Sequence, residues 1–86
     1  MASYSILLTR SAAKELERVP TKDRQRIVTR ISALANNPLP VGAEKLSGDE
    51  KYRIRQGDYR ILYEIVDAEL IVTVVRVRHR GEVYRR

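Results

Sequence analysis

The stretch KYRIRQGDYRILYEIV, residues 51–66, contains two strand-like segments that meet at Gly57 and Asp58. In the first segment the residues alternate, so that Tyr52 and Ile54 fall on one face and Arg53 and Arg55 on the other. A Gly-Asp pair between two such segments is typical of a tight turn. The stretch therefore predicts an antiparallel hairpin with one apolar face and one basic face.

The residues after this hairpin predict a further strand. Residues 67–69 (DAE) form a short polar break, and residues 70–78 (LIVTVVRVR) are apolar on both faces for most of their length. A strand of this kind suits the interior of a sheet that helices cover on one side. The hairpin and this strand together predict a three-strand antiparallel meander.

The residues before the hairpin predict one short strand and two helices. Residues 4–9 (YSILLT) are apolar and strand-like, and residues 10–19 carry apolar residues at helical spacing, with Thr9 or Ser11 as the N-cap. Pro20 ends this helix, and Thr21 is the expected N-cap of a second helix that closes at residues 36–38. Its expected apolar stripe is Ile27, Val28, Ile31, Leu34 and Ala35.

Residues 39–50 are rich in Pro, Gly and Ser and are expected to form a loop. The order strand, helix, helix, strand, strand, strand predicts an α+β fold. We expect a single domain over residues 1–86, with a four-strand antiparallel sheet and a helix hairpin packed on one face.

Composition narrows the classes of function. The chain has 86 residues, a net charge of +6, one histidine and no cysteine. The absence of cysteine excludes disulfides and thiolate metal sites, and it is compatible with the cytoplasm. No apolar segment is long enough to cross a membrane. A basic chain of this size favours polyanionic partners such as nucleic acid.

The positive charge is concentrated in the predicted sheet. From Lys51 onward nine residues are basic and five are acidic. Arg53 and Arg55 share a face, and the hairpin turn brings Arg60 opposite Arg55. A solvated sheet face usually mixes charges, so this single-sign face indicates an anion site, and arginine suits phosphate. The helix charges are interspersed, as in residues 14–18 and 22–24, and are expected to form solvated faces with weak pairing.

The available side chains fit few chemistries. One histidine and scattered acids do not make a metal centre, no glycine-rich phosphate loop is present, and no motif marks a serine nucleophile. Metal-free RNA cleavage needs fewer protein groups, because the 2′-hydroxyl of the RNA is the nucleophile. Arginines stabilise the charge that develops, and a histidine such as His79 can carry a proton near neutral pH. Tyr84 can stack on a base or donate a proton.

These residues resemble the RelE branch of the RelE/ParE toxin superfamily. The likeness lies in KL-x-G, in a tyrosine followed by alternating basic residues, in YR-x-x-Y, and in a last apolar strand that runs into HR and EVY. The resemblance implies a cytoplasmic toxin that enters the ribosomal A site and cleaves mRNA without a metal or other cofactor. It also implies a cognate antitoxin, and operator DNA binding only through the toxin–antitoxin complex.

The resemblance assigns a role to each candidate site residue. Arg53 and Arg55 would hold the scissile phosphate, Arg60 would stabilise the transition state, and Arg80 would assist the leaving group. Tyr84 would orient the target nucleotide, and His79 falls where relatives have histidine or lysine. Further basic residues expected to contact RNA or the ribosome are Lys45, Lys51 and Arg78.

The sequence leaves three questions open. Some relatives have lysines at the positions of Arg53 and Arg55, and arginine is a very poor base, so the base role moves to His79 or Tyr84.

The alternatives to an endonuclease are a ParE-like DNA gyrase inhibitor and a non-catalytic module that binds RNA or a protein. In a regular strand His79 and Arg80 would point to opposite faces, so both reach one site only if the strand ends or bulges near them.

Overall fold

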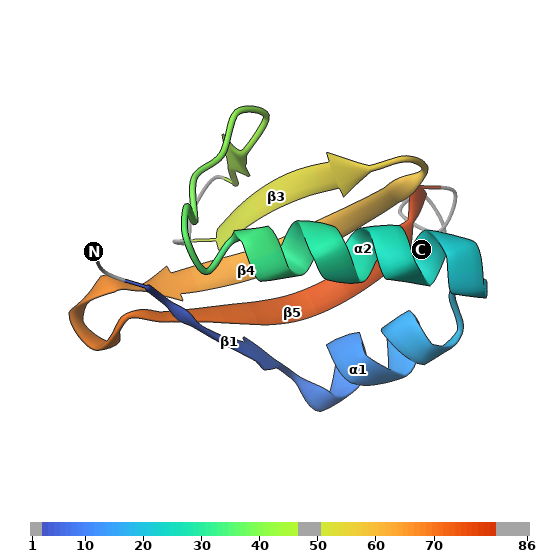
Figure 1. The fold of residues 1–86 in the computed structure, drawn as a ribbon, viewed down its shortest axis with the longest axis horizontal. Helices are drawn as coiled ribbons and strands as arrows, with labels where there is room; N and C mark the ends of the chain where they lie inside the picture. The colour runs from blue at the N-terminus through green and yellow to red at the C-terminus, as the bar shows by residue number, and fades with distance from the viewer. Residues whose placement is uncertain (1–2, 47–50, 81–86) are drawn as a thin grey trace.

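The computed structural model describes residues 3–46 and 51–80. Two helices lie against one face of a five-stranded sheet (Figure 1). The elements in chain order are β1 (Ser5–Leu8), α1 (Arg10–Glu17), α2 (Thr21–Ala33), β2 (Glu44–Lys45), β3 (Lys51–Gln56), β4 (Tyr59–Val66), the 3-10 helix η1 (Asp67–Glu69) and β5 (Ile71–His79).

The sheet has the strand order β1-β5-β4-β3-β2. The predicted hairpin is confirmed: β3 pairs antiparallel with β4 around Gly57, which has a φ of +60°, and β4 pairs antiparallel with β5. The expectation of a four-strand, fully antiparallel sheet is wrong. β1 pairs parallel with β5, with Ser5 opposite Ile71. The two helices return the chain to the end of the sheet at which β1 begins (Figure 1), so a later strand can run in the same direction as β1.

The fifth strand, β2, lies in the segment that the sequence predicted to be only a loop. Glu44 pairs with Arg53 and Lys45 with Tyr52, both antiparallel. Two residues are too few to leave a periodic pattern in the sequence, so this strand depends on its neighbour β3.

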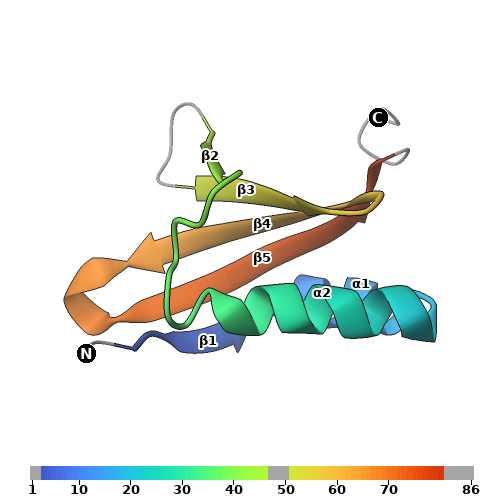
Figure 2. The same ribbon diagram turned by 45° about the horizontal axis from the view of Figure 1, so that its top comes forward.

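The helices begin and end close to the predicted positions. Thr9 caps α1, and its hydroxyl accepts a hydrogen bond from the N–H of Ala12 at 3.1 Å. Thr21 is not the cap of α2, since Pro20 holds that position and no side chain caps the helix. In the predicted stripe, Val28 is 44% exposed and does not join the core. Figure 2 shows both helices on the same side of the sheet, which leaves the other side of β3, β4 and β5 uncovered by helices.

The core lies between the helices and the sheet. Tyr63 is fully buried, and its hydroxyl donates a hydrogen bond to the carbonyl of Pro38 at 2.6 Å. Burial raises the pKa of Tyr63 to about 12. The buried apolar residues are Ala12, Val19, Ile27, Ile31, Leu34, Ile54, Ile61, Tyr63, Val72, Val74 and Val77.

A bulge in β5 decides which side chains face the helices. Leu62 pairs with Arg76 and Tyr63 pairs with Val74, so Val75 is an extra residue in the ladder. Val74 and Val77 are therefore both buried in the core, although their spacing is odd. In the described part of the chain, no helix is long and apolar enough to cross a membrane.

Candidate nucleic-acid interface

The sheet face opposite the helices carries five arginines in two cross-strand rows. In one row Arg60 pairs with Arg55 on one side and with Arg78 on the other. In the next row Leu62 pairs with Arg53 and with Arg76. Directly paired residues share a face, so all five guanidinium groups belong to the same surface. We call this surface the arginine face; it consists of Arg53, Arg55, Arg60, Arg76 and Arg78.

A hollow of about 180 Å³ lies within the arginine face. Leu46 and Leu62 supply its apolar lining, and Arg53, Arg60, Arg76 and Arg78 supply the charge. Apolar side chains beside guanidinium groups offer a surface on which a base can rest while its phosphate meets the charge. The arrangement therefore suits a nucleotide better than a bare anion.

Among the described residues, Arg53 and Arg76 form salt bridges with acids at the margins of the arginine face. Arg53 forms a salt bridge with Glu44 of β2, and this hydrogen bond, with the arginine's charge, lowers the pKa of Glu44. Arg76 bonds Glu15 of α1 through Nε at 3.1 Å and through Nη2 at 2.8 Å. Glu15 also accepts the backbone N–H of Val77 at 2.8 Å, at an edge of β5 that β1 no longer covers.

The row of Arg55, Arg60 and Arg78 contains no acidic residue. Like charges that are directly opposed in a sheet destabilise it by about 0.2–1 kcal/mol for each pair. An anion bound over this row would neutralise the two like-charged pairs and so stabilise the fold. This row is consequently a favourable place for an anion to bind.

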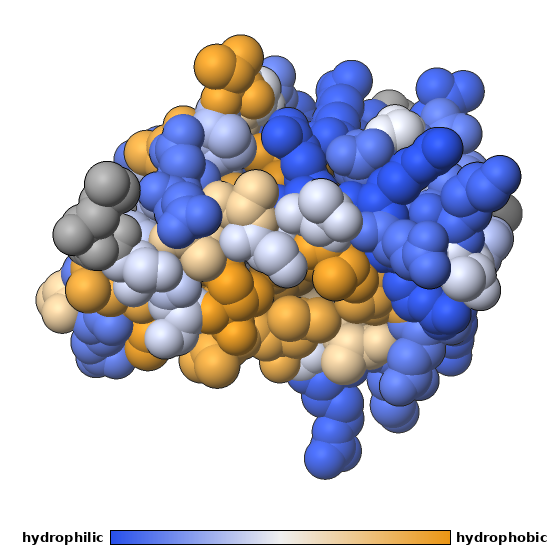
Figure 3. Space-filling view, in the orientation of Figure 1, coloured by the Kyte–Doolittle hydropathy of each residue, from blue (hydrophilic) through white to orange (hydrophobic). Residues whose placement is uncertain are grey.

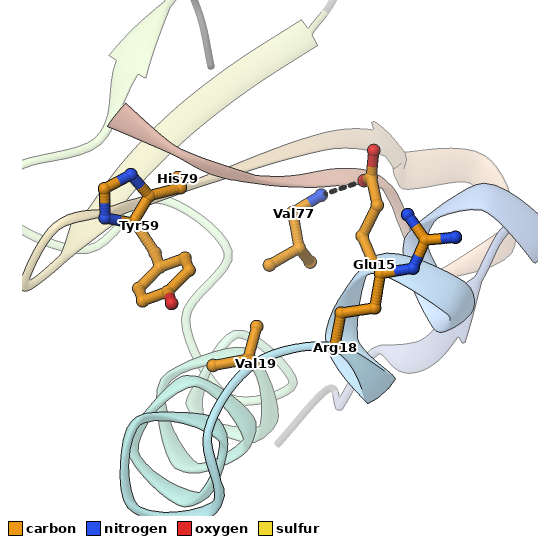
Figure 4. A pocket seen from close by; sticks show the side chains of 6 residues that line it. All are labelled: Glu15, Arg18, Val19, Tyr59, Val77 and His79. Atoms are coloured by element: carbon orange, nitrogen blue, oxygen red, sulfur yellow. Dashed lines mark hydrogen bonds between the residues drawn. The ribbon is translucent and has the colours of Figure 1, made fainter. Parts of the chain in front are cut away.

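His79 does not join the arginines. It pairs with Tyr59, and the two rings meet edge to face with their centroids 5.2 Å apart. Both line a pocket of about 260 Å³ on the helix side, with Val19 and Val77 beside them and Glu15 and Arg18 across from them (Figure 4). The alternation after the bulge accounts for this, because Arg78 faces one side of the sheet and His79 the other.

Arg80 follows the end of β5 and is held at the β3–β4 turn. Its backbone N–H donates to the carbonyl of Asp58 at 2.7 Å, and its Nε lies 3.8 Å from the Asp58 carboxylate. Its side chain is 69% exposed. Arg80 thus lies next to the turn from which Arg60 emerges, while Tyr84 lies outside the described residues.

Of the other residues expected to contact RNA or the ribosome, two lie on the face that carries the arginines and one on the opposite face. Arg78 belongs to the arginine face, directly opposite Arg60. Lys51 lies on the same face one row further along, where its Nζ is 3.9 Å from the carboxylate of Glu64. Lys45 is exposed and pairs with Tyr52, so by register it shares the opposite face.

Sequence reasoning did not assign a role to Arg76 or to the apolar lining from Leu46 and Leu62. The two-residue spacing of Arg76 and Arg78 was a usable signal, because it places them on one face. Within the described residues, no group of three or more His, Cys, Asp or Glu side chains could hold a metal ion.

The chain is similar to known toxins along most of its length. Residues 6–84 match the family described as the ParE toxin of type II toxin–antitoxin systems. The chain is 33% identical to Toxin RelG of Mycobacterium tuberculosis, over 96% of this chain and 98% of that protein. It is 28% identical to the mRNA interferase toxin RelE of Escherichia coli, over 95% of this chain and 90% of that protein.

Solved structures show the same fold. The RelBE2 toxin–antitoxin complex of Mycobacterium tuberculosis contains a chain with a TM-score of 0.83 and 28% identity, matched over 94% of this chain and 95% of that one. The RelB–RelE complex of Methanococcus jannaschii gives a TM-score of 0.74 and 32% identity, over 91% and 94%. The chain belongs to the RelE/ParE superfamily and is a RelE-like toxin of a type II toxin–antitoxin system.

Proposed function

We propose that this toxin is a ribosome-dependent mRNA endonuclease and that the arginine face is its cleavage site. The observation that carries the proposal is the row in which Arg60 lies between Arg55 and Arg78. A related Escherichia coli toxin is named an mRNA interferase, which supports RNA as the substrate. Action on mRNA in the ribosomal A site implies that the toxin works in the cytoplasm.

The proposed reaction needs no metal ion. The 2′-oxygen loses its proton and forms a bond to the adjacent phosphorus while the bond from phosphorus to the 5′-oxygen breaks. The 5′-oxygen takes up a proton, so the products are a cyclic phosphate and a 5′-hydroxyl. Negative charge grows on the phosphate oxygens during this step, and fixed guanidinium groups stabilise it without reorganisation.

The roles follow from position on the sheet. Arg60 holds the non-bridging oxygens at the centre of the row, while Arg55 and Arg78 approach from the neighbouring strands. Arg53, held by Glu44, fixes the adjoining part of the phosphate chain. Arg80, at the turn, assists the leaving group.

Proton transfer is assigned to Tyr84 in preference to His79. The imidazole of His79 lies on the helix side, away from Arg60. Tyr84 matches a tyrosine of the resembled family that orients the nucleotide. Lys45 and Lys51 contribute, in this proposal, to attraction of the ribosome and not to chemistry.

The partners follow from the same proposal. A cognate antitoxin binds the toxin and silences it, and the +6 charge favours an acidic partner. Structural relatives have been solved as toxin–antitoxin complexes, which supports this partner. Operator DNA is bound only by that complex.

The test is the Arg60→Ala variant in an in vitro translation reaction with mapping of mRNA 5′ ends. We expect ribosome-dependent cuts with the native toxin and a loss of about 100-fold or more in the variant, the scale seen when a transition-state donor is removed. Lys14→Ala, on the exposed face of α1, is the control and should cut normally. Normal cutting by the Arg60 variant would contradict the proposal.

A second function is favoured by one observation, the match to a family described by its ParE toxins. In that reading the chain inhibits DNA gyrase. Loss of gyrase supercoiling with no mRNA cleavage would support it. RNA binding without either activity would instead favour a non-catalytic module.

A further inference from the structure

Helix α2 carries a row of basic side chains that the cleavage site does not use. Lys22, Arg26 and Arg30 are spaced four residues apart and therefore share one side of the helix. None of them forms an ion pair within residues 3–46 and 51–80. Lys22 and Arg26 are exposed, as expected for a solvated helix face. Like charges at this spacing nevertheless repel by about 0.2–0.5 kcal/mol for each pair.

Arg30 connects this row with strand β3. It lines a hollow of about 280 Å³ together with Gly42, Glu44, Arg53 and Arg55. It also lines a second hollow of about 440 Å³ together with Gln25, Arg26, Thr29 and Gln56. We call these two hollows, which share Arg30, the α2–β3 groove.

One guanidinium nitrogen of Arg30, Nε, lacks an acceptor among the described residues. This nitrogen is buried. Gly42, with a φ of +97°, brings the loop backbone beside it, and a Cβ there would lie 3.8 Å from Arg30 Nη2. A buried donor without an acceptor is costly, so an incoming anion that reaches the groove would relieve this cost.

The lining of the groove indicates the class of ligand. Arginine, amide and hydroxyl side chains line it, with one glycine and a single acid, and that acid, Glu44, is already bonded to Arg53. Protein interfaces have apolar, often aromatic, centres, and no such residue lines either hollow. Arginines with neutral hydrogen-bond donors are typical of contacts to the phosphate–sugar backbone of nucleic acid.

The groove is continuous with the arginine face. Arg53 lines both the hollow of that face and the hollow beside Arg30. The surface in Figure 3 shows hydrophilic side chains gathered over the first part of α2 and the β3–β4 turn, while apolar side chains lie over the middle, towards β1. The shared lining residues Arg53 and Arg30 therefore connect the arginine face with α2.

We propose that the α2–β3 groove is a second RNA-backbone site, in which Arg26 and Arg30 bind phosphates of the RNA strand that extends from the cleavage site. The direction of the RNA strand in this inference rests on the proposed function. The groove supplies affinity and register, and it takes no part in bond breaking.

The test uses the double variant Arg26→Gln/Arg30→Gln. The matched control is Arg10→Gln/Lys14→Gln, which removes the same charge at the same spacing from exposed positions of α1. Binding of a fluorescent single-stranded RNA is measured by anisotropy at several salt concentrations, with thermal unfolding as the check on folding. We expect the α2 variant to bind about tenfold more weakly, with a salt slope lower by about 1.5, and the control to change much less.

Ribosome-dependent cleavage gives the second readout. The α2 variant should need about tenfold more substrate for half-maximal cutting, with an unchanged maximal rate, as expected when binding that does not change in the transition state is lost. Equal RNA affinity and salt slope in the α2 variant and the control would overturn the inference, even if both cleave mRNA.

The two proposals can fail separately. If the native toxin cuts no mRNA but the α2 variant still loses RNA affinity, the groove stands and the endonuclease assignment falls. If the α2 variant keeps its RNA affinity but loses affinity for the antitoxin, the groove is a protein-binding site and the inference is wrong.

Discussion

Arg60 and Ile61 are neighbours in β4, yet they belong to surfaces with opposite physical demands. Ile61 is fully buried under the helices, between Ile54 and Val77. Arg60 lies on the other face, between Arg55 and Arg78. The covered face gains stability by excluding water, whereas like charges repel on the arginine face and a bound anion would reduce that repulsion. Substitutions on the two faces should therefore separate stability from activity.

The largest effect is expected from Ile61→Ala on the covered face. Removing this side chain leaves a cavity in the closely packed core and should lower the free energy of unfolding by about 2–5 kcal/mol. Urea denaturation followed by circular dichroism measures it. Arg60→Ala is the neighbouring control and should change the free energy of unfolding by less than about 0.5 kcal/mol. If the two variants lose equal stability, the division between the faces is wrong.

Substitutions of two adjacent residues of β5 test whether the arginine face, and not the helix side of the sheet, carries the catalytic groups. Arg78→Ala should slow ribosome-dependent mRNA cleavage by about 100-fold, because it removes a donor from the row around Arg60. His79→Gln should slow cleavage by less than about threefold, because its imidazole faces the helix side. A general base contributes about 100-fold or more. A loss of that size in His79→Gln would place histidine in the chemistry.

Glu15→Ala tests the boundary between the two faces. This carboxylate bonds both Arg76 and the N–H of Val77, so its loss leaves the edge of β5 without an acceptor. We expect the free energy of unfolding to fall by about 1–3 kcal/mol. Hydrogen exchange at the Val77 amide should accelerate more than at Val74, which lies in the part of β5 that β1 covers. Uniform acceleration along β5 would argue against a local role for Glu15.

The smallest effect is expected from Tyr63→Phe. The lost hydrogen bond to Pro38 should cost about 1 kcal/mol at neutral pH. The pKa of Tyr63 is raised to about 12, so the fold binds this proton more tightly than the unfolded chain, in which tyrosine titrates near about 10. Its contribution to stability is full below about pH 10 and is lost as the pH rises towards 12.

The measurement is denaturant unfolding at a series of alkaline pH values. Between pH 10 and 12 the native protein should lose more stability than Tyr63→Phe does, so the gap between them narrows. Parallel pH profiles would show that Tyr63 does not titrate differently in the two states.

The sequence alone was sufficient for the hairpin and for the pairing of arginines across it. Strict alternation in residues 51–56 and the Gly57 turn predicted β3, β4 and the pairing of Arg55 with Arg60, since the two-residue period is a local property of the strand. The N-cap at Thr9 was among the predicted positions, because capping depends only on the next few residues. The parallel pairing of β1 with β5 could not be predicted from the sequence, because the paired residues lie more than sixty residues apart.

The tertiary structure alone decided where the end of β5 points. If the alternation of Val72 and Val74 continued, Arg76 and Arg78 would enter the core and His79 would lie on the opposite face. The bulge at Val75 shifts this register by one residue, so the arginines join Arg60 and His79 turns to the helices. The spacing of Arg76 and Arg78 places them on one face, but it does not decide which face that is. The shift follows from the packing of Val77 under the helices and from Glu15, which holds the adjacent backbone.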